Sequence, residues 1–341
     1  MKIQKSKLYL YPAIIGLVLI IGILIYFFLV SVSVKEDIHY IYIDDDDTQD
    51  SVVNKIRPIA SSTSIICLQN LLRHTGYKDH IKTGRYAINP GEGIVTIYRR
   101  LKNGQQSSLN LTIPESRTMD KLAAVLGKKL MLDSATIAEA LHSQETCQKY
   151  GYDTCTIPAM FIPNTYDIYW NVSLDGFLER MKKEHDRFWN AERTVKTNFH
   201  GLTPNEVTTL ASIIDEETAN TEEKPMIAGM YMNRLKKKMP LQADPTVKFA
   251  LKQFGLKRIY NKQLKTSSPY NTYVNVGLPP GPIKIASIKG IDAVLNAVNH
   301  EYLYMCAKED FSGTHNFAKT YQEHLQNAAK YTKALNERGI K

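Results

Sequence analysis

The sequence predicts an α+β protein with an N-terminal apolar helix, a small α+β module and a larger mixed α/β domain. Three observations lead to this prediction: an uncharged run at residues 8–34, alternating strand-like and helical stretches at residues 40–106, and a longer region of helices and aromatic turns after residue 109. The chain has 341 residues, which suits about two domains. Its composition, 43% hydrophobic and 23% charged, fits a chain that buries a full core and excludes a disordered or collagen-like protein.

The uncharged run predicts a transmembrane anchor at residues 8–34. At about 1.5 Å per helical residue, the run can cross a hydrocarbon core of about 30 Å. Residues 1–7 contain three lysines, whereas the charges just after the run nearly cancel. The positive-inside tendency therefore keeps the short tail in the cytoplasm and places the rest outside. The alternative is a signal peptide cleaved near Ser31 or Ser33. Because the run exceeds an ordinary signal core of about 7–15 residues and no A-x-A site follows, we expect an uncleaved single-pass anchor in the cytoplasmic (inner) membrane, with the later domains periplasmic.

The net charge and the cysteine content limit the kinds of partner and cofactor that the sequence predicts. The chain has 43 Lys and Arg against 34 Asp and Glu, and the resulting +9 favours a polyanion such as nucleic acid, anionic lipid or acidic wall polymer. Export and the lack of a helix-turn-helix, RNP or zinc-finger pattern argue against nucleic acid. No H-E-x-x-H or C-x-x-C motif occurs, so neither a metal nor another cofactor is predicted. Cys147 and Cys155 are close enough in sequence for a small disulfide bridge, which export permits but does not require.

The first exported segment, residues 36–108, is predicted to be a small α+β module. Alternation at residues 40–44 predicts a strand, and apolar spacings of three and four predict helices over residues 48–75, divided by a proline. A second strand is predicted over residues 82–91, where it ends in a Pro-Gly turn, and another helix over residues 94–101.

The remaining residues, 109–341, are predicted to form one mixed domain. A strand is expected at residues 109–114, and helices over residues 117–141 and 177–189. Residues 160–170 form an aromatic, turn-rich segment between these helices.

The clearest helix of this domain begins at residue 203. Thr203 is a natural N-cap, Pro204 suits the first helical position, and Glu206 completes a capping box. These local signals predict a helix that continues to residue 218.

Three adjacent carboxylates, Asp215, Glu216 and Glu217, lie at the end of this helix. At about 100° per residue, Glu217 falls roughly 50° from the centre of the apolar arc, Asp215 about 110° and Glu216 about 150°. Glu217 is therefore the carboxylate expected against apolar surface, where a raised pKa would let it act as a general acid. The alternative is a salt-bridged helix-end residue with a structural role.

Polar and rigid clusters follow this helix. They are Asn233-Arg-Leu235, Leu241–Val247, Ser268–Tyr273, Gly277–Ile283 and Gly313–Phe317. Aromatic rings and side-chain amides suit pyranose faces and hydroxyl groups, and three prolines make the fourth cluster a rigid loop. Each cluster alone is more often a structural turn, but together in one exported domain they predict a sugar-binding site.

These segments resemble the MltG (YceG-like) endolytic murein transglycosylases. The resemblance rests on an ordered set of motifs, which are Ala211-Ser-Ile-Ile-Asp-Glu-Glu-Thr218, Asn233-Arg-Leu235, Leu241-Gln-Ala-Asp-Pro-Thr-Val247, Tyr270-Asn-Thr-Tyr273, Gly277-Leu-Pro-Pro-Gly281 and His315-Asn-Phe317. Ile113-Pro-Glu115 and Phe161-Ile-Pro-Asn-Thr-Tyr166 match more loosely. The anchor and residues 36–108, which resemble the family's LysM-like subdomain, extend the resemblance to nearly the whole chain.

The resemblance implies a lyase whose domain at residues 109–341 has a lysozyme-like active-site helix. Such an enzyme cleaves the β-1,4 bond between N-acetylmuramic acid (MurNAc) and N-acetylglucosamine (GlcNAc) within nascent peptidoglycan, leaves 1,6-anhydro ends and limits strand length. The family's catalytic acid corresponds to Glu217, and Asp215 occupies a position where the family frequently has Glu. Penicillin-binding protein synthases are the implied partners. The implied substrate-binding residues are Asn233, Gln242, Asp244, Thr246, Tyr270, Asn271, Tyr273 and His315.

Two other functions fit the same residues. One is a lysozyme-type muramidase, a hydrolase in which Glu217 is the acid and Asp215 or Asp244 positions water. The other is a non-catalytic scaffold that binds the cell wall and tethers synthases to glycan. Anhydro ends distinguish the lyase from the hydrolase, and a functional Glu217→Gln protein would favour the scaffold.

Overall fold

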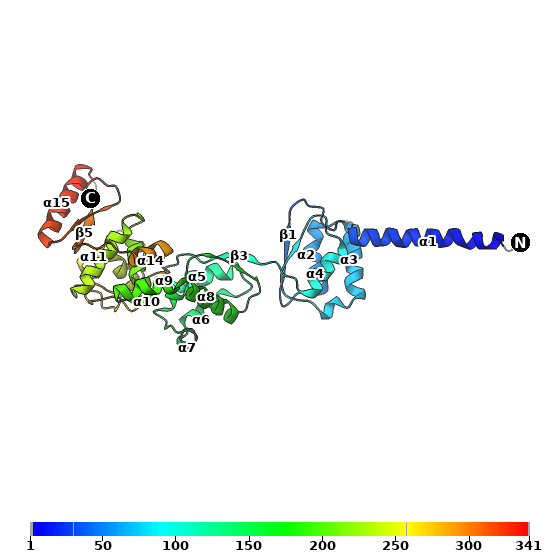
Figure 1. The fold of residues 1–341 in the computed structure, drawn as a ribbon, viewed down its shortest axis with the longest axis horizontal. Coiled ribbons are helices and arrows are strands. Elements are labelled where there is room, and N and C mark those ends of the chain that lie inside the picture. Colours follow the sequence, from blue (N-terminus) through cyan, green and yellow to red (C-terminus); the bar gives the residue numbers. More distant parts are fainter. Residues whose placement is uncertain (1–2, 30, 257, 340–341) are drawn as a thin grey trace. The chain divides into compact units, whose positions relative to one another are not determined.

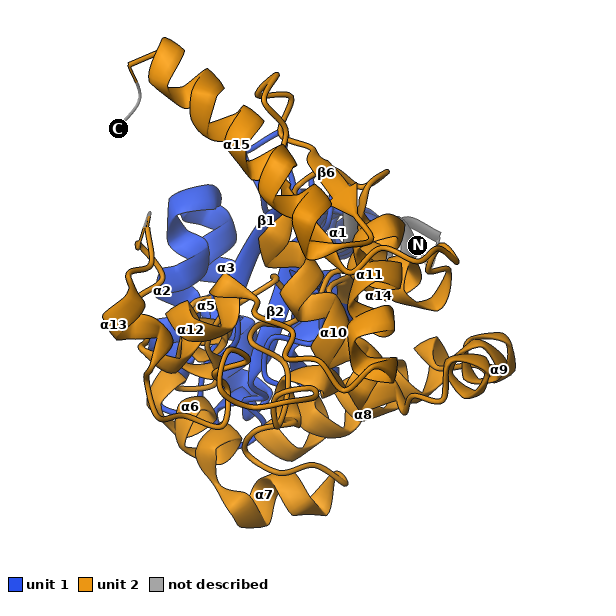
Figure 2. Cartoon of the chain, turned by 90° about the vertical axis from the view of Figure 1, so that its left-hand side faces the viewer, with its two compact units in different colours: residues 1–111, 129–131, 167–172 blue, residues 112–128, 132–166, 173–341 orange. Residues whose placement is uncertain are grey.

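The structure is a computed structural model that describes residues 3–29, 31–256 and 258–339; in the first helix, side chains are described from residue 10 to residue 26. It is a mixed α+β structure in which the described residues form many helices and three two-stranded sheets (Figure 1). The chain divides into two compact units (Figure 2). Unit 1 comprises residues 1–111, 129–131 and 167–172, and unit 2 comprises residues 112–128, 132–166 and 173–341. One sheet pairs β3 (Leu109–Thr112) with β4 (Thr165–Ile168).

Unit 1 combines one antiparallel pair of strands with helices. β1 (His39–Ile43) pairs antiparallel with β2 (Gly84–Ile88), so that His39 lies opposite Ile88. The predicted strands and helices of this segment are confirmed, and Pro58 lies in a short 3₁₀ turn between two of the helices. The helices are α1 (Ile3–Leu29), α2 (Gln49–Ile56), α3 (Ser62–His74) and α4 (Ile94–Asn103).

Helix α1 contains most of the predicted membrane anchor, residues 8–34. Over the residues that the structure describes, no helix combines the length and the apolarity that a bilayer span requires. The anchor therefore finds no support in this result and stays a prediction.

Unit 2 contains most of the helices and the third sheet. β5 (Tyr304–Ala307) pairs antiparallel with β6 (His315–Ala318), with Tyr304 opposite Ala318. The helices of this unit are α5 (Met119–Gly127), α6 (Ser134–His142), α7 (Gln144–Lys149), α8 (Leu174–Phe188), α9 (Ala191–His200), α10 (Pro204–Glu217), α11 (Lys224–Lys236), α12 (Asp244–Ala250), α13 (Asn261–Leu264), α14 (Ile288–Leu295) and α15 (Tyr321–Glu337).

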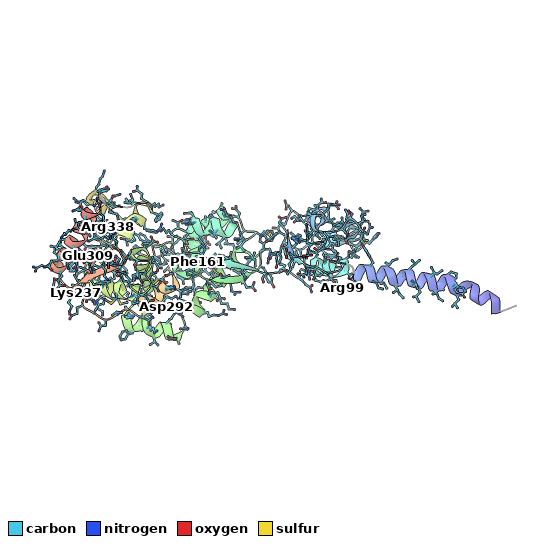
Figure 3. The ribbon with its side chains drawn as sticks, turned by 90° about the horizontal axis from the view of Figure 1, so that it is seen from above. Arg99, Phe161, Lys237, Asp292, Glu309 and Arg338 are labelled. Atoms are coloured by element: carbon cyan, nitrogen blue, oxygen red, sulfur yellow. The ribbon has the colours of Figure 1, made fainter. Side chains whose placement is uncertain are left out.

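Helix α10 lies at the centre of the hydrophobic core of unit 2, where it packs against α9, α11, α12 and α14. Its residues from Val207 to Ile214 are all buried, so it has no solvent-facing side along this stretch. A second part of the core contains Phe161, whose ring stacks on Phe177 with 6.4 Å between centroids (Figure 3). The packing of α9, α11, α12 and α14 against α10 holds the end of this helix, with its three carboxylates, in place.

Two predicted turns contain strands in the structure. The aromatic segment at residues 160–170 includes β4, and the polar cluster at residues 313–317 contributes to β6. Both strands have only four residues, and each forms by pairing with a partner elsewhere in the chain.

The four cysteines are all free thiols, so the bridge between Cys147 and Cys155 is not formed. Cys147 is buried, and its sulfur lies 3.5 Å from the carbonyl oxygen of Leu141. Burial raises the pKa of the Cys147 thiol, which therefore packs as a small apolar side chain.

Candidate active site

Helix α10 begins as its sequence predicts. The Thr203 hydroxyl accepts a hydrogen bond from the backbone N–H of Glu206 at 3.3 Å, and the Glu206 carboxylate accepts one from the backbone N–H of Thr203 at 2.7 Å. Pro204 occupies the first turn, where its missing N–H costs nothing. The predicted N-cap and capping box are therefore confirmed, and they set the start of the helix that carries the acidic triplet.

The first carboxylate of the triplet, Asp215, links α10 to α11 and to the start of α14. Its side chain is 1% exposed, forms an ion pair with Lys224, and accepts hydrogen bonds from the backbone N–H and hydroxyl of Ser287 at 2.6 and 2.8 Å. Gly290 leaves the room for this contact, because a Cβ there would lie 2.5 Å from an Asp215 oxygen. Helical rotation alone places Asp215 away from the apolar arc, but α11 and α14 cover that side and bury it.

The second carboxylate, Glu216, belongs to a partly exposed ion-pair network. It accepts hydrogen bonds from the Arg117 guanidinium at 2.6 and 3.2 Å, and Lys284 Nζ lies 3.6 Å from Oε1, the oxygen that also accepts from Arg117 Nε. Lys284 also pairs with Glu115 at 2.9 Å. Both oxygens of Glu216 therefore face cations.

The third carboxylate, Glu217, has a different environment. Its half-buried side chain accepts a hydrogen bond from the Tyr231 hydroxyl at 2.9 Å and, unlike its two neighbours, has no ion-pair partner among the described residues. The structural alternative of a salt-bridged helix end therefore does not describe this side chain. Glu217 has the unpaired, sheltered setting that a general acid requires.

Burial is the main reason that the pKa of Glu217 rises to about 7. The nearby charge of Asp244 raises this pKa as well, whereas the Tyr231 hydrogen bond and the positive charges of His315 and Lys248 lower it. The protonated and ionised forms are thus both well populated near neutral pH, and one carboxyl group can donate a proton and later accept one.

Glu217 opens onto a cavity of about 320 Å³, called here the catalytic pocket. Four of the predicted substrate-binding residues line it: Gln242, Asp244, Tyr273 and His315. Polar groups from α10, α11, α12, β5, β6 and α15 surround it. Several of these residues were not predicted as site residues, namely Tyr231, Arg234, Tyr304 and Tyr321. A wall this rich in hydroxyl, amide and charged groups suits a hydroxyl-rich ligand such as a sugar.

The first residue of α12 and the segment just before this helix present two polar groups to the catalytic pocket. Asp244 accepts a hydrogen bond from the Tyr273 hydroxyl at 2.6 Å. Gln242 has a left-handed backbone with φ of 52°, which is held by a 3.0 Å hydrogen bond from its N–H to the carbonyl oxygen of Thr272. A left-handed backbone is uncommon for a residue other than glycine, and it persists here because the surrounding loop fixes it.

His315 is held at the pocket by a carboxylate that sequence patterns did not reveal. Glu223 accepts hydrogen bonds from the backbone N–H of His315 at 2.6 Å and from its ring Nδ1 at 2.9 Å. The Glu223 side chain is 8% exposed. This pairing fixes the ring, and Nε2 has no hydrogen-bond partner in the part of the chain that the structure describes.

Four predicted substrate-binding residues lie elsewhere, where three of them hold loops together. Asn233 donates hydrogen bonds to the carbonyl oxygens of His300 and Tyr302, and Asn271 to those of Leu264 and Thr266. Thr246 is fully buried and bonds to the Thr272 hydroxyl at 2.9 Å. The fourth, Tyr270, packs on Phe249 with 4.7 Å between ring centroids and lines a separate cavity.

Arg234 lines the catalytic pocket and is hydrogen-bonded to the backbone around it. This buried side chain donates hydrogen bonds to the carbonyl oxygens of Leu303 at 2.6 Å and Leu241 at 2.8 Å. Burial lowers the pKa of its guanidinium. The Asn233-Arg-Leu235 motif thus contributes its arginine to the pocket and its asparagine to the adjacent loop.

Comparisons with known proteins agree with this arrangement. The sequence model of the YceG-like family matches residues 41–330. The chain is similar to the endolytic murein transglycosylase of Bacillus subtilis (strain 168), with 30% identity over 274 residues that cover 75% of each protein. It is also similar to the endolytic murein transglycosylase of Streptococcus pneumoniae (strain D39), with 26% identity over 76% of this chain and 52% of that protein, so the match spans about half of the pneumococcal protein.

A solved structure is also similar. The crystal structure of a yceG-like protein from Listeria monocytogenes matches with a TM-score of 0.55 and 25% identity. The match covers 86% of this chain and 99% of that one.

Proposed function

This chain belongs to the YceG-like family, and we propose that it is an endolytic murein transglycosylase, a lyase that cuts within peptidoglycan strands. The observation that carries the proposal is Glu217, a half-buried carboxyl group that has no ion-pair partner within the described residues and is bonded to Tyr231 at the edge of a polar pocket. The names of the Bacillus and Streptococcus relatives support the same activity. The bond cut is the β-1,4 linkage from MurNAc to GlcNAc.

In the first step, protonated Glu217 donates its proton to the glycosidic oxygen as the C1–O bond breaks. Positive charge develops on the ring oxygen and C1 of the muramyl residue, as in other glycosidic cleavages. The departing GlcNAc hydroxyl keeps the donated proton, and Glu217 becomes ionised. The raised pKa of Glu217 makes the protonated starting form available near neutral pH.

In the second step, ionised Glu217 accepts the proton of the muramyl C6 hydroxyl. The C6 oxygen closes onto C1 and forms the 1,6-anhydro ring, so Glu217 returns to its protonated form and no water is consumed. Because the nucleophile belongs to the same sugar, its effective concentration is already high. A single positioned carboxyl group is therefore sufficient.

The other residues of the pocket are proposed to hold the strand. Gln242, Asp244, Tyr273 and His315 line the catalytic pocket and offer an amide, a carboxylate, a hydroxyl and an imidazole to sugar hydroxyl and acetamido groups. The Glu223–His315 pair fixes one of these groups, and the Tyr273–Asp244 hydrogen bond fixes two more.

A lysozyme-type hydrolase needs a second carboxylate that can position water. Asp215 is unsuited, because its oxygens are bonded to Lys224 and Ser287 in the interior. Asp244 lines the catalytic pocket and is the remaining candidate for that role. Mass spectrometry of muropeptides released by the purified protein decides between the reactions: anhydro-muramyl ends indicate the lyase, and reducing ends indicate the hydrolase.

The Tyr231→Phe protein tests the environment of the acid. The lost hydrogen bond favours the ionised form of Glu217, so its removal raises the pKa of Glu217 further. Since the protonated form starts the reaction, activity is lost as pH rises through this pKa. We expect the alkaline limb of kcat/KM against pH to move up by about one unit, the effect of one hydrogen bond of about 1.4 kcal/mol. If the alkaline limb does not move, the ionisation that limits activity at high pH is not that of Glu217.

We also propose that residues 8–34 anchor the chain in the cytoplasmic (inner) membrane, with residues 1–7 in the cytoplasm and residues 36–341 on the periplasmic side. The support is the uncharged sequence and the exposed apolar side chains of α1, among them Leu10, Ile15 and Leu19, each more than half exposed. We expect the protein in cell membranes to keep its original N-terminus. A mature chain that begins near Ser33 would contradict the anchor. Partnership with penicillin-binding protein synthases rests on the family resemblance alone.

A further inference from the structure

Unit 2 contains a second cavity, of about 200 Å³, which the reaction at Glu217 does not use. Its walls are mainly apolar and aromatic, formed by Met119, Pro158, Phe249, Phe254, Tyr270 and Pro282. The rings pack on one another: Phe249 lies 4.7 Å from Tyr270 and 6.3 Å from Phe254, measured between centroids. The second cavity therefore differs in chemistry from the catalytic pocket, whose lining is mostly polar.

Helix α12 connects the two cavities. Asp244, its first residue, lines the catalytic pocket, and Phe249, near its end, lines the second cavity. Between them, Pro245 and Lys248 line a third, small cavity of about 40 Å³ that also includes Phe249 and Phe254. The three hollows thus follow the same seven-residue helix, which is about 10 Å long at 1.5 Å per residue.

Positive charge accompanies this apolar wall. Arg117 lies over the Phe254 ring at 5.7 Å and is neutralised by Glu216, while Lys284 is neutralised by Glu115. Lys248 and Lys252 have no ion-pair partner in the part of the chain that the structure describes.

Acidic charge at the second cavity is already paired. Asp120, the acidic residue in its lining, pairs with His142 at 2.9 Å. Lys252 stands at the second cavity with a left-handed backbone, φ 54°, as Gln242 does at the catalytic pocket. The second cavity therefore offers an apolar wall and an available cation to a ligand that has both methyl groups and carboxylates.

We propose that the second cavity binds the stem peptide of a muramyl residue. This peptide carries alanine methyl groups and free carboxylates, which match the rings and Lys252 respectively. Its length also fits, because an extended chain covers up to about 3.3–3.6 Å per residue, so that about three residues span α12. The inference rests on the proposed function, since glycan held at Glu217 delivers the peptide to this cavity.

The test measures binding rather than cleavage. The full-length Glu217→Gln protein in detergent is titrated with uncross-linked glycan strands that carry stem peptides, and with the same strands after an amidase has removed the peptides. Amidase treatment hydrolyses the amide between the lactyl group and the peptide and frees one carboxylate on each muramyl residue. The treated strand therefore keeps a negative charge at each muramyl residue but has lost the alanine methyl groups and carboxylates of the peptide. We expect peptide-bearing strands to bind about tenfold more tightly, the factor for one charge-assisted hydrogen bond.

Two charge reversals locate the effect. Adding Lys252→Glu is expected to abolish the tenfold preference by weakening only the peptide-bearing complex. Lys237→Glu, at an exposed lysine outside the cavities, is the matched control and should keep the preference (Figure 3). Equal Kd values for both strands would overturn the proposal. So would an equal loss of affinity for both strands with Lys252→Glu, which would assign the cavity to the glycan itself. A wild-type protein that made no anhydro ends would contradict the proposed reaction and leave this binding comparison intact.

Discussion

The Glu217→Gln protein is expected to form anhydro-muropeptides at least about a hundredfold more slowly than the wild type, because a positioned general acid typically contributes 10²–10⁴ in rate. Glutamine has nearly the same shape and can still accept the hydrogen bond from Tyr231. It lacks the proton that the glycosidic oxygen needs and cannot take the proton of the C6 hydroxyl. Mass spectrometry of the released muropeptides measures the rate, and thermal unfolding checks that the protein is folded.

Glu216→Gln is the matched control for this result. It makes the same chemical change one residue earlier, at a carboxylate held by Arg117 and Lys284 outside the catalytic pocket. Partly exposed ion pairs contribute about 0–1 kcal/mol, so we expect activity within a few-fold of the wild type. Wild-type activity in Glu217→Gln would contradict the mechanism, and an unfolded Glu217→Gln protein would support a structural role for that carboxylate.

Local chemistry explains why the sequence could predict helix α10 and its start. A cap, a first-turn proline and a capping box act within four residues, and the structure has all three. The apolar periodicity of the same segment placed Glu217 nearest the apolar arc, but it did not reveal that Lys224 and Ser287 enclose Asp215 more completely. The helices of unit 1 could be predicted equally well, because their apolar residues recur at intervals of three and four.

Contacts between distant residues explain what the sequence could not predict. Tyr231 bonds to Glu217 from fourteen positions away, and Glu223 holds His315 across 92 positions. Nothing near either residue indicates its partner. The β5–β6 pair likewise depends on a register that its two four-residue strands do not determine alone.

Motif residues also proved to have two different tasks. Gln242 and Asp244 face the catalytic pocket, whereas Asn271 and Thr246 bond to the loops around it. Amide and hydroxyl groups serve both tasks with the same hydrogen bonds, so residue type cannot separate them. The three-dimensional arrangement is needed to tell a group that faces the ligand from one that fixes a loop.

Asp215 illustrates this distinction most strongly, and Asp215→Asn is expected to lower the free energy of unfolding by about 3–5 kcal/mol, the usual cost of removing one partner of a buried ion pair. The substitution leaves the buried Lys224 ammonium without a counter-charge and weakens the bonds from Ser287. Urea unfolding of the purified chain measures the loss. Because the Asp215 carboxylate is bonded inside the core, we expect the activity of the Asp215→Asn protein to fall between the activities of the Glu216→Gln and Glu217→Gln proteins.

A second substitution separates stability from chemistry. If the cost in Asp215→Asn comes from the unpaired ammonium, then adding Lys224→Met removes that charge and should recover a large part of the lost stability, because apolar replacements of buried ion pairs are often neutral. The double variant should then also recover activity, since Glu217 and Tyr231 are unchanged. An Asp215→Asn protein that is as stable as the wild type but inactive would show instead that this carboxylate takes part in the reaction, and the single-acid mechanism would have to be replaced by one with two carboxylates.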